Sequence, residues 1–143
     1  MFKDLNKNPI LWTDGYKLCH KDQYPAHTSW IYETWTPRVS RIAGVQHVLF
    51  FGLQAAMAEL VANFKANFFA KPEAEVLRDY EEAIQSVFAT SNPAFANNHS
   101  SAHIRDLHRL GYLPLKIKAL KEGTLVPIGV PMFTVENTLP DFF

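Results

Sequence analysis

The amino-acid sequence predicts an α+β fold, in which a largely antiparallel sheet packs with about three to four helices. Apolar residues repeat at helical spacing through the middle of the chain, between residues 52 and 110, whereas residues 115–136 alternate between apolar and polar. A second strand-like block of β-branched and aromatic residues occupies residues 28–36. Because helices and strands fall into separate blocks, α+β is favoured over an alternating α/β arrangement.

The first structured stretch is a short helix within residues 13–25. Thr13 can cap this helix, and Asp14 then lies near the positive end of the helix dipole. Tyr16 and His20 are four residues apart and share one face. Pro25 ends the helix, which is too short to be stable without tertiary packing.

Residues 28–36 predict a strand that Pro37 ends, which places Arg38 at the strand exit. The apolar run at residues 48–51 is either a buried strand or the approach to a helix.

Three longer helices follow. The first covers residues 52–69, and the second begins at Pro72, because proline suits a first helical turn. Residues 90–93 break the chain, and polar residues at 97–101 offer caps for a third helix that ends at Gly111.

The last part of the chain predicts three strands at residues 115–120, 124–127 and 132–136. In the first of these, lysines occupy the solvent face. Turns at residues 122–123 and 128–131 separate the three strands. With 143 residues, the chain has the length of a single domain, 1–143. The two phenylalanines at its end indicate that further protein follows.

Composition excludes several partners. Fourteen basic residues balance fourteen acidic ones, so no overall field attracts nucleic acid or an anionic membrane. No apolar run reaches the length of a membrane span, and the first residues do not lead into a signal peptide. The single cysteine excludes an internal disulfide and fits a reducing compartment. We therefore expect a cytoplasmic protein.

Few residues suggest chemistry from spacing alone. His99 and His103 have the spacing of a helical metal pair, but no third ligand is evident, so we interpret them as a surface pair. Cys19 and His20 are adjacent and diverge on a helix, which argues against a nucleophile–base dyad. The chain contains no glycine-rich phosphate loop.

Two other residues could bind a ligand. Tyr16, near a helix start, could stack on a flat ring, and Arg38 could grip a phosphate through its planar guanidinium group. From spacing alone, a structural role is favoured for each. Arg105, His108 and Arg109 form a modest basic edge, which we interpret as a solvated helix face.

Several motifs occur in an order that resembles one enzyme family, the nicotinamide phosphoribosyltransferases, in their N-terminal region. The motifs are Thr13-Asp14-Gly15-Tyr16-Lys17 with His20 and Gln23-Tyr24-Pro25, Thr28-Ser29, Phe51-Gly52-Leu53-Gln54, Gly111-Tyr112-Leu113-Pro114-Leu115-Lys116-Ile117-Lys118-Ala119, Glu122-Gly123, Val126-Pro127 and Phe133-Thr134-Val135-Glu136-Asn137-Thr138. The related nicotinate enzymes have similar motifs, but the block from Gly111 to Ala119 and the block Val135-Glu136-Asn137-Thr138 are closer to the nicotinamide branch.

The resemblance implies the reaction of nicotinamide with phosphoribosyl pyrophosphate to give nicotinamide mononucleotide and pyrophosphate, with Mg²⁺, in NAD salvage. It implies a homodimer with each active site at the subunit interface, where the N-terminal region contributes substrate-binding residues. By the matching motifs these are Tyr16, which stacks on the ring, Asp14 beside it, and Arg38, which reaches toward the phosphate. Gly15 departs from the small polar residue expected there.

The family's catalytic barrel is absent from these 143 residues, and with it the second stacking aromatic, the phosphate contacts and the Mg²⁺ site. We therefore expect no catalytic residue and no cofactor in this chain, which is inactive by itself as a fragment or split product. The alternatives are a dimerisation or interaction module of the same ancestry, which joins a second copy or a barrel-containing partner chain, and the N-terminal part of a nicotinate phosphoribosyltransferase. An unrelated α+β protein with chance motif matches is the remaining interpretation.

Overall fold

The computed structural model describes residues 8–143, which form two compact units. The helical unit consists of the described residues up to Ala26 together with Glu59–Leu113. The sheet unit consists of His27–Ala58 and Pro114–Phe143. Each unit is described by itself below. Helices and antiparallel strands in separate blocks confirm the predicted α+β class.

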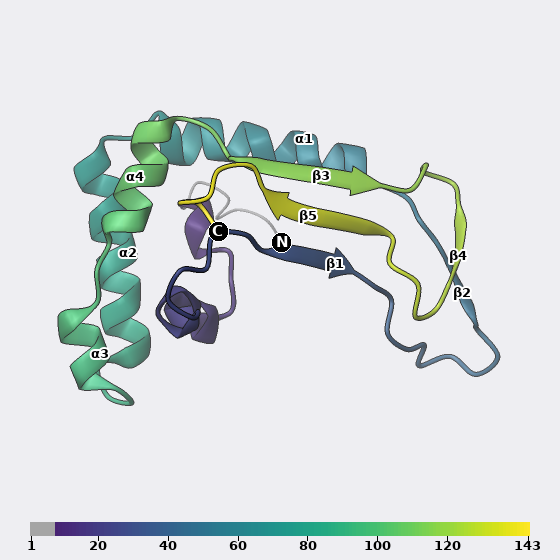
Figure 1. Ribbon diagram of the computed structural model, residues 1–143, viewed down its shortest axis with the longest axis horizontal. Coiled ribbons are helices and arrows are strands. Elements are labelled where there is room, and N and C mark those ends of the chain that lie inside the picture. The colour runs from purple at the N-terminus through teal and green to yellow at the C-terminus, as the bar shows by residue number, and fades with distance from the viewer. Residues whose placement is uncertain (1–7) are drawn as a thin grey trace. The chain divides into compact units, whose positions relative to one another are not determined.

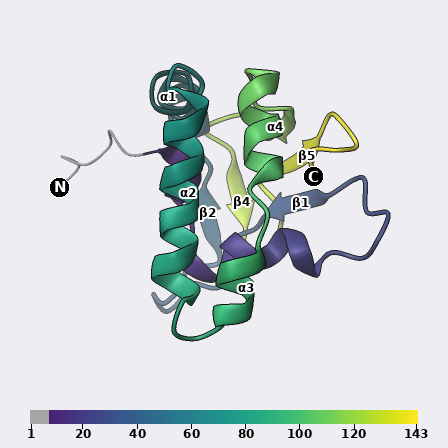
Figure 2. The ribbon, with the colours of Figure 1, turned by 90° about the vertical axis from the view of Figure 1, so that its left-hand side faces the viewer.

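The helical unit contains most of the helices (Figure 2). Its elements are η1 (Pro9–Leu11), η2 (Gly15–Gln23), the second half of α1 (Leu53–Phe64), η3 (Lys65–Phe69), α2 (Glu73–Phe88), α3 (Pro93–Asn98) and α4 (Ala102–Leu110). Among these, η1 and η2 are 3₁₀ segments, and η3 is a π-helical extension of α1. The predicted helix over residues 52–69 is therefore confirmed, with a change of helical type near its end.

One face of α2 forms the core of the helical unit. Val76, Tyr80 and Ile84 are spaced four residues apart, and each is buried. Phe68 from η3 and Ile104 from α4 complete the buried cluster. Partly buried side chains from these and the other elements of the unit pack against it: Ile10, Leu18, Phe64, Phe69, Leu77, Phe88, Phe95 and Leu107.

The predicted ends of α2 and α4 agree with the structure, but α3 was missed. Residues 90–93 do end α2, yet a new helix begins at Pro93, because the Asn92 side chain accepts a hydrogen bond from the Phe95 amide at 3.2 Å. Asparagine followed by proline is a helix start signal, whereas residues 90–93 were predicted only to break the chain. Gly111 ends α4 in the left-handed conformation, at φ 80°, as predicted.

The sheet unit contains two antiparallel sheets (Figure 1). In the first, β5 (Phe133–Asn137) lies between β1 (Tyr32–Trp35) and β3 (Leu115–Ala119). In the second, β2 (His47–Leu49) pairs with β4 (Leu125–Pro127). All three pairings are antiparallel, as predicted, and Pro127 ends its strand as expected.

The burial of the strands departs from the prediction in one place. Of the two interpretations of residues 48–51, the strand is correct, but β2 is not buried: Leu49 is exposed and only the following Phe50 enters the core. The lysines of β3 face solvent, as predicted, and Lys116 pairs with Glu136 of β5 at 2.8 Å. That ion pair raises the pKa of Lys116 and lowers the pKa of Glu136.

None of the helices in residues 8–143 is both long and apolar enough to cross a membrane.

The first turn of α1 is held by an acidic side chain of the sheet unit. The Gln54 amide donates a hydrogen bond to Glu122 Oε1 at 2.8 Å, which satisfies a free amide at the positive end of the helix dipole.

Asn137, at the end of β5, ties three segments of the sheet unit together. Its side-chain amide donates to the carbonyl oxygens of Ser29 and Leu139, each at 2.8 Å. Its side-chain oxygen accepts a hydrogen bond from the Ile31 amide, also at 2.8 Å. Only 3% of this residue is exposed, so water cannot replace these hydrogen bonds. Asn137 therefore fixes the approach to β1 and the chain that leaves β5.

We predict that Asn137→Ala lowers the free energy of unfolding by about 2–4 kcal/mol, since three buried hydrogen bonds are lost at about 1 kcal/mol each and their partners stay unpaired. Urea unfolding measures this change. Asn97→Ala, at an exposed position of α3, is the matched control and should cost about 0.5 kcal/mol or less. An Asn137→Ala midpoint equal to that of the unmutated chain would contradict the role assigned to Asn137.

Candidate functional site

The predicted helix at residues 13–25 is present as the 3₁₀ segment η2, but its cap differs from the prediction. Asp14, and not Thr13, is the N-cap residue, and no side chain caps the first turn. The Asp14 carboxylate instead pairs with Lys17 Nζ at 3.1 Å, and the Asp14 carbonyl oxygen accepts a hydrogen bond from the Lys17 amide at 2.9 Å. The prediction of a Thr13 cap was therefore wrong, because the short turn is closed by Asp14 and Lys17.

Tyr16 projects from η2 as an exposed aromatic ring, with 60% of the residue accessible to solvent. His20 lies on the same face, as predicted, with its ring centroid 5.4 Å from that of Tyr16. Lys17 Nζ lies 5.8 Å from the Tyr16 ring centroid. The ring is thus partly enclosed by polar groups and remains open to a flat ligand within this unit.

The start of η2 packs closely on α2. A Cβ atom at Gly15 would lie 3.3 Å from Val87 Cγ1, which is tighter than ordinary van der Waals contact. The glycine that departs from the family pattern therefore allows the backbone beside Tyr16 to approach α2. Three residues after Gly15, Leu18 packs against the buried cluster of the helical unit.

Cys19 lies on η2 and is bonded within it. Its thiol donates a hydrogen bond to the Tyr16 carbonyl oxygen at 3.0 Å, and its sulfur accepts one from Gln23 Nε2 at 3.1 Å. Neither contact pairs Cys19 with a base, so a nucleophilic dyad has no support among these contacts.

Arg38 belongs to the sheet unit and is exposed, a short distance past the end of β1, as predicted. It lines an open hollow of about 570 Å³ formed by residues 38–40 and 42–47 together with Pro127 and Ile128. The Gly129 amide donates to the Pro37 carbonyl oxygen at 2.8 Å, which fixes the chain just before Arg38. Asp14 and Tyr16 thus share one helix of the helical unit, whereas Arg38 lies on the other unit.

The two histidines that were interpreted as a surface pair are half-buried. Nε2 of His99 and Nδ1 of His103 are both buried without a hydrogen-bond partner among residues 8–143. Both rings pack edge-on against Tyr80, at centroid distances of 6.0 and 5.5 Å. The interpretation as a surface pair therefore holds only in part, because the two half-buried rings also pack against Tyr80.

No group of three or more His, Cys, Asp or Glu side chains in residues 8–143 is arranged to hold a metal ion. The described residues therefore offer no cluster of such side chains for the Mg²⁺ that the family resemblance implies.

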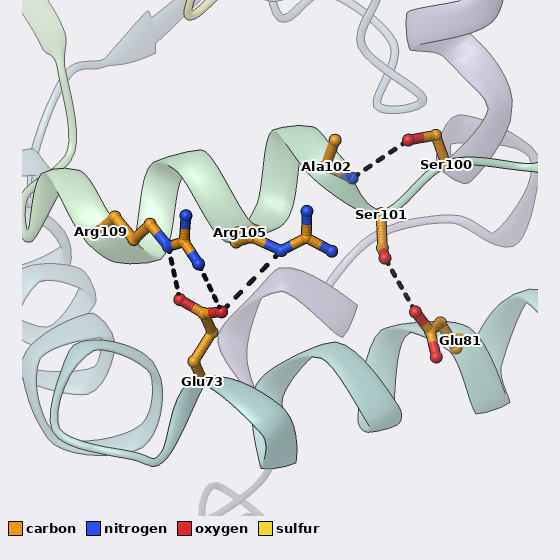
Figure 3. Close-up of polar contacts among 7 residues, drawn as sticks. All are labelled: Glu73, Glu81, Ser100, Ser101, Ala102, Arg105 and Arg109. Atoms are coloured by element: carbon orange, nitrogen blue, oxygen red, sulfur yellow. Dashed lines mark hydrogen bonds and ion pairs between the residues drawn. The ribbon is translucent and has the colours of Figure 1, made fainter.

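The basic edge of α4 is engaged with α2 (Figure 3). Arg109 donates hydrogen bonds to both carboxylate oxygens of Glu73, at 2.8 and 3.1 Å, and Arg105 Nε lies 3.8 Å from the same carboxylate. The hydrogen bond from Arg109 holds the pKa of Glu73 below its ordinary value. Further along, Ser101 donates to Glu81 at 2.8 Å. These contacts join the two helices along one side, with Ser101 buried and the Arg109–Glu73 pair exposed.

The chain belongs to the family described as the nicotinamide phosphoribosyltransferase N-terminal domain, whose model matches residues 8–117. Two relatives are each called nicotinamide phosphoribosyltransferase. The one from Acinetobacter baylyi is 39% identical over 142 residues, which cover 95% of this chain and 27% of the relative. The one from Xanthomonas campestris pv. campestris is 32% identical over 135 residues, which cover 92% of this chain and 25% of the relative.

The chain therefore spans about a quarter of the length of these relatives. The match includes η2 with Asp14 and Tyr16, the β1 exit with Arg38, and the helical unit that supports η2. Within residues 8–143 every strand pairing is antiparallel.

We predict that the chain loses stability as the pH falls from 6.5 toward 4, because of His103. Burial, with a smaller effect from Lys21, lowers the pKa of His103 to about 4 from its ordinary 6.5, while Asp22 and Asp106 oppose the shift. Between pH 6.5 and pH 4 the unfolded chain binds a proton at His103 that the folded chain does not bind. The free energy of unfolding is therefore at its full value above pH 6.5 and falls as the pH drops below 6.5. At pH 4.5 the loss is about 2 kcal/mol relative to pH 7.

His103→Gln removes this titration, so its unfolding free energy should fall less between pH 7 and pH 4.5 than that of the unmutated chain. Parallel pH curves for the two chains, measured by urea unfolding, would sink the assignment to His103.

Proposed function

We propose that this chain is the N-terminal domain of a nicotinamide phosphoribosyltransferase, which forms nicotinamide mononucleotide and pyrophosphate in NAD salvage. The family match over residues 8–117 and the two relatives of that name support this proposal. In the reaction, the pyridine nitrogen of nicotinamide forms a bond to C1 of the ribose. The bond from C1 to the pyrophosphate oxygen breaks, and the pyrophosphate leaves with the electron pair.

The observation that carries the role of this chain is the exposed Tyr16 ring on a helix that is anchored on its other side. We propose that Tyr16 stacks on the nicotinamide ring, with Asp14 beside it in the pocket. An offset stack contributes about 0.5–1.5 kcal/mol beyond the burial of the two faces. The stack orients the ring so that its nitrogen faces the ribose, and orientation of this kind lowers the barrier of the bond-forming step.

For Arg38 we propose a contact with the phosphate of the second substrate. The side chain is exposed at the rim of a hollow in the sheet unit, and no ion pair or hydrogen bond of the described residues occupies it. A guanidinium group in that position can bind two phosphate oxygens at once.

The chain by itself is proposed to be catalytically incomplete. Stabilising the leaving pyrophosphate needs several charged groups that face it. Tyr16 and Asp14 would contact the nicotinamide ring, and Arg38 alone would supply a positive charge for a phosphate. We propose that the complete enzyme is a cytoplasmic homodimer. A barrel segment of this enzyme provides the remaining substrate contacts and the Mg²⁺ site. The single cysteine agrees with a reducing compartment.

The alternative is a binding module of the same ancestry that serves dimerisation or association with a barrel-containing chain. The aromatic side chains along β1 favour it: Trp30, Tyr32 and Trp35 are each 57% exposed or more. Large exposed aromatics on an outer strand are typical of an interface. For the substrate, the names of both relatives favour nicotinamide over nicotinate.

The proposal is tested with a chimera in which this chain replaces the matching segment of the Acinetobacter baylyi relative. We predict that the chimera forms nicotinamide mononucleotide, and that Tyr16→Ala raises the KM for nicotinamide about tenfold, as expected when a stack of about 1.4 kcal/mol is lost. Tyr16→Phe keeps the ring and is the matched control, with a KM within about threefold of the unmutated chimera.

An unchanged KM in Tyr16→Ala would remove Tyr16 from the site. The 143-residue chain is assayed alongside with nicotinamide and phosphoribosyl pyrophosphate. Turnover by that chain alone would contradict the proposal that it is incomplete, whereas a chimera without turnover would favour the binding module.

A further inference from the structure

We propose that Tyr80 of α2 is a positioning residue, which fixes η2 through Leu18 and thereby sets the direction in which Tyr16 points. This inference rests on the proposed function of Tyr16, and it assigns to the buried core of the helical unit a part in binding nicotinamide.

The helix that carries Tyr16 cannot hold its own shape. It is a 3₁₀ segment of nine residues, Gly15–Gln23, and none of them is buried. Such segments have poor hydrogen-bond geometry and rarely exceed three or four residues without support. No side chain caps its first turn either. Contacts with other elements must therefore determine where η2 lies.

The contacts come from α2 and lie on both sides of Tyr16 in the sequence. The Tyr80 hydroxyl donates a hydrogen bond to the Leu18 carbonyl oxygen at 3.3 Å. At the other end, Gly15 lies against Val87, where a Cβ would be 3.3 Å from Cγ1. Residues 80 and 87 are seven positions apart and therefore share one face of α2. Tyr16 lies between the two points of attachment.

Of these two contacts, the one from Tyr80 is better fixed. Tyr80 is 4% exposed, whereas Val87 is 42% exposed and can shift. The rings of His99 and His103 pack edge-on against Tyr80, so its ring is held from a second side. Burial raises the pKa of Tyr80 to about 12, with smaller effects from Asp22 and Cys19, and the hydroxyl therefore remains a donor at any physiological pH.

Cys19 provides a direct readout, because it lies on η2 and is the single cysteine of the chain. In the 143-residue chain, Tyr80→Phe keeps the ring in the core and removes the hydroxyl that donates to Leu18. We expect the rate at which an aromatic disulfide reagent labels Cys19 to rise about fivefold, as for the loss of one buried hydrogen bond.

Ile104→Val is the matched control. Ile104 belongs to the same buried cluster, but it comes from α4 and its truncation leaves both attachments of η2 in place. It should leave the labelling rate within about twofold while it lowers the urea midpoint. Labelling that rises equally in Ile104→Val and Tyr80→Phe would overturn the proposal, because Tyr80 would then act only through general stability. An unchanged rate in Tyr80→Phe would overturn it as well.

The consequence for binding is measured in the Acinetobacter baylyi chimera. Tyr80→Phe is expected to raise the KM for nicotinamide about threefold and to leave kcat within about twofold, since a displaced Tyr16 weakens ring binding. If Tyr16→Ala raises the KM and Tyr80→Phe does not, the positioning role is overturned and the proposed function stands. If Cys19 labelling rises in Tyr80→Phe and Tyr16→Ala leaves the KM unchanged, the proposed role of Tyr16 fails, and Tyr80 retains only its hold on η2.

Discussion

The burial of one face of α2 is the constraint on which the helical unit depends. Val76, Tyr80 and Ile84 repeat every four residues and lose nearly all contact with water. Burial of an apolar side chain of this size contributes about 1.5–3 kcal/mol, which offsets the cost of ordering short elements that are not stable alone. The other elements of the helical unit assemble around α2. Of these, α3, α4 and η1 contact α2, and η3 contacts α4 and η1. The anchored side of η2 meets the buried cluster through Leu18.

Much of this fold could be predicted, because the signals were local. The apolar period of α1 and α2, the proline at the start of α2 and the glycine after α4 each act within one turn of the residues they control. The errors were local as well. The six residues of α3 are too few to show a helical period. Thr13 was preferred as the cap of η2 because the pattern does not show which of two neighbouring polar residues comes directly before the first turn, and in the structure this residue is Asp14, which pairs with Lys17.

The candidate site was predictable only in part. Tyr16 and Arg38 were selected by resemblance to a family, since spacing alone favoured a structural role for each. The contacts that hold the site and the sheet unit in place left no local signal. Tyr80 and Leu18 are 62 positions apart, and Asn137 bonds to Ile31 and Ser29 across 106 and 108 positions. Contacts of this kind depend on the completed fold, and no pattern within a short window contains them.

The central place of β5 affects how the chain can fold during synthesis. β5 is the partner of both β1 and β3, and β1 precedes it by about one hundred residues. A ribosome that has released Leu113 has delivered every element of the helical unit, but β1 still has no partner. Its aromatic residues, Tyr32 and Trp35 among them, therefore remain on an open strand edge until β5 emerges. During this interval the open edge can pair with another chain and start aggregation, and a chaperone that covers it would protect the chain.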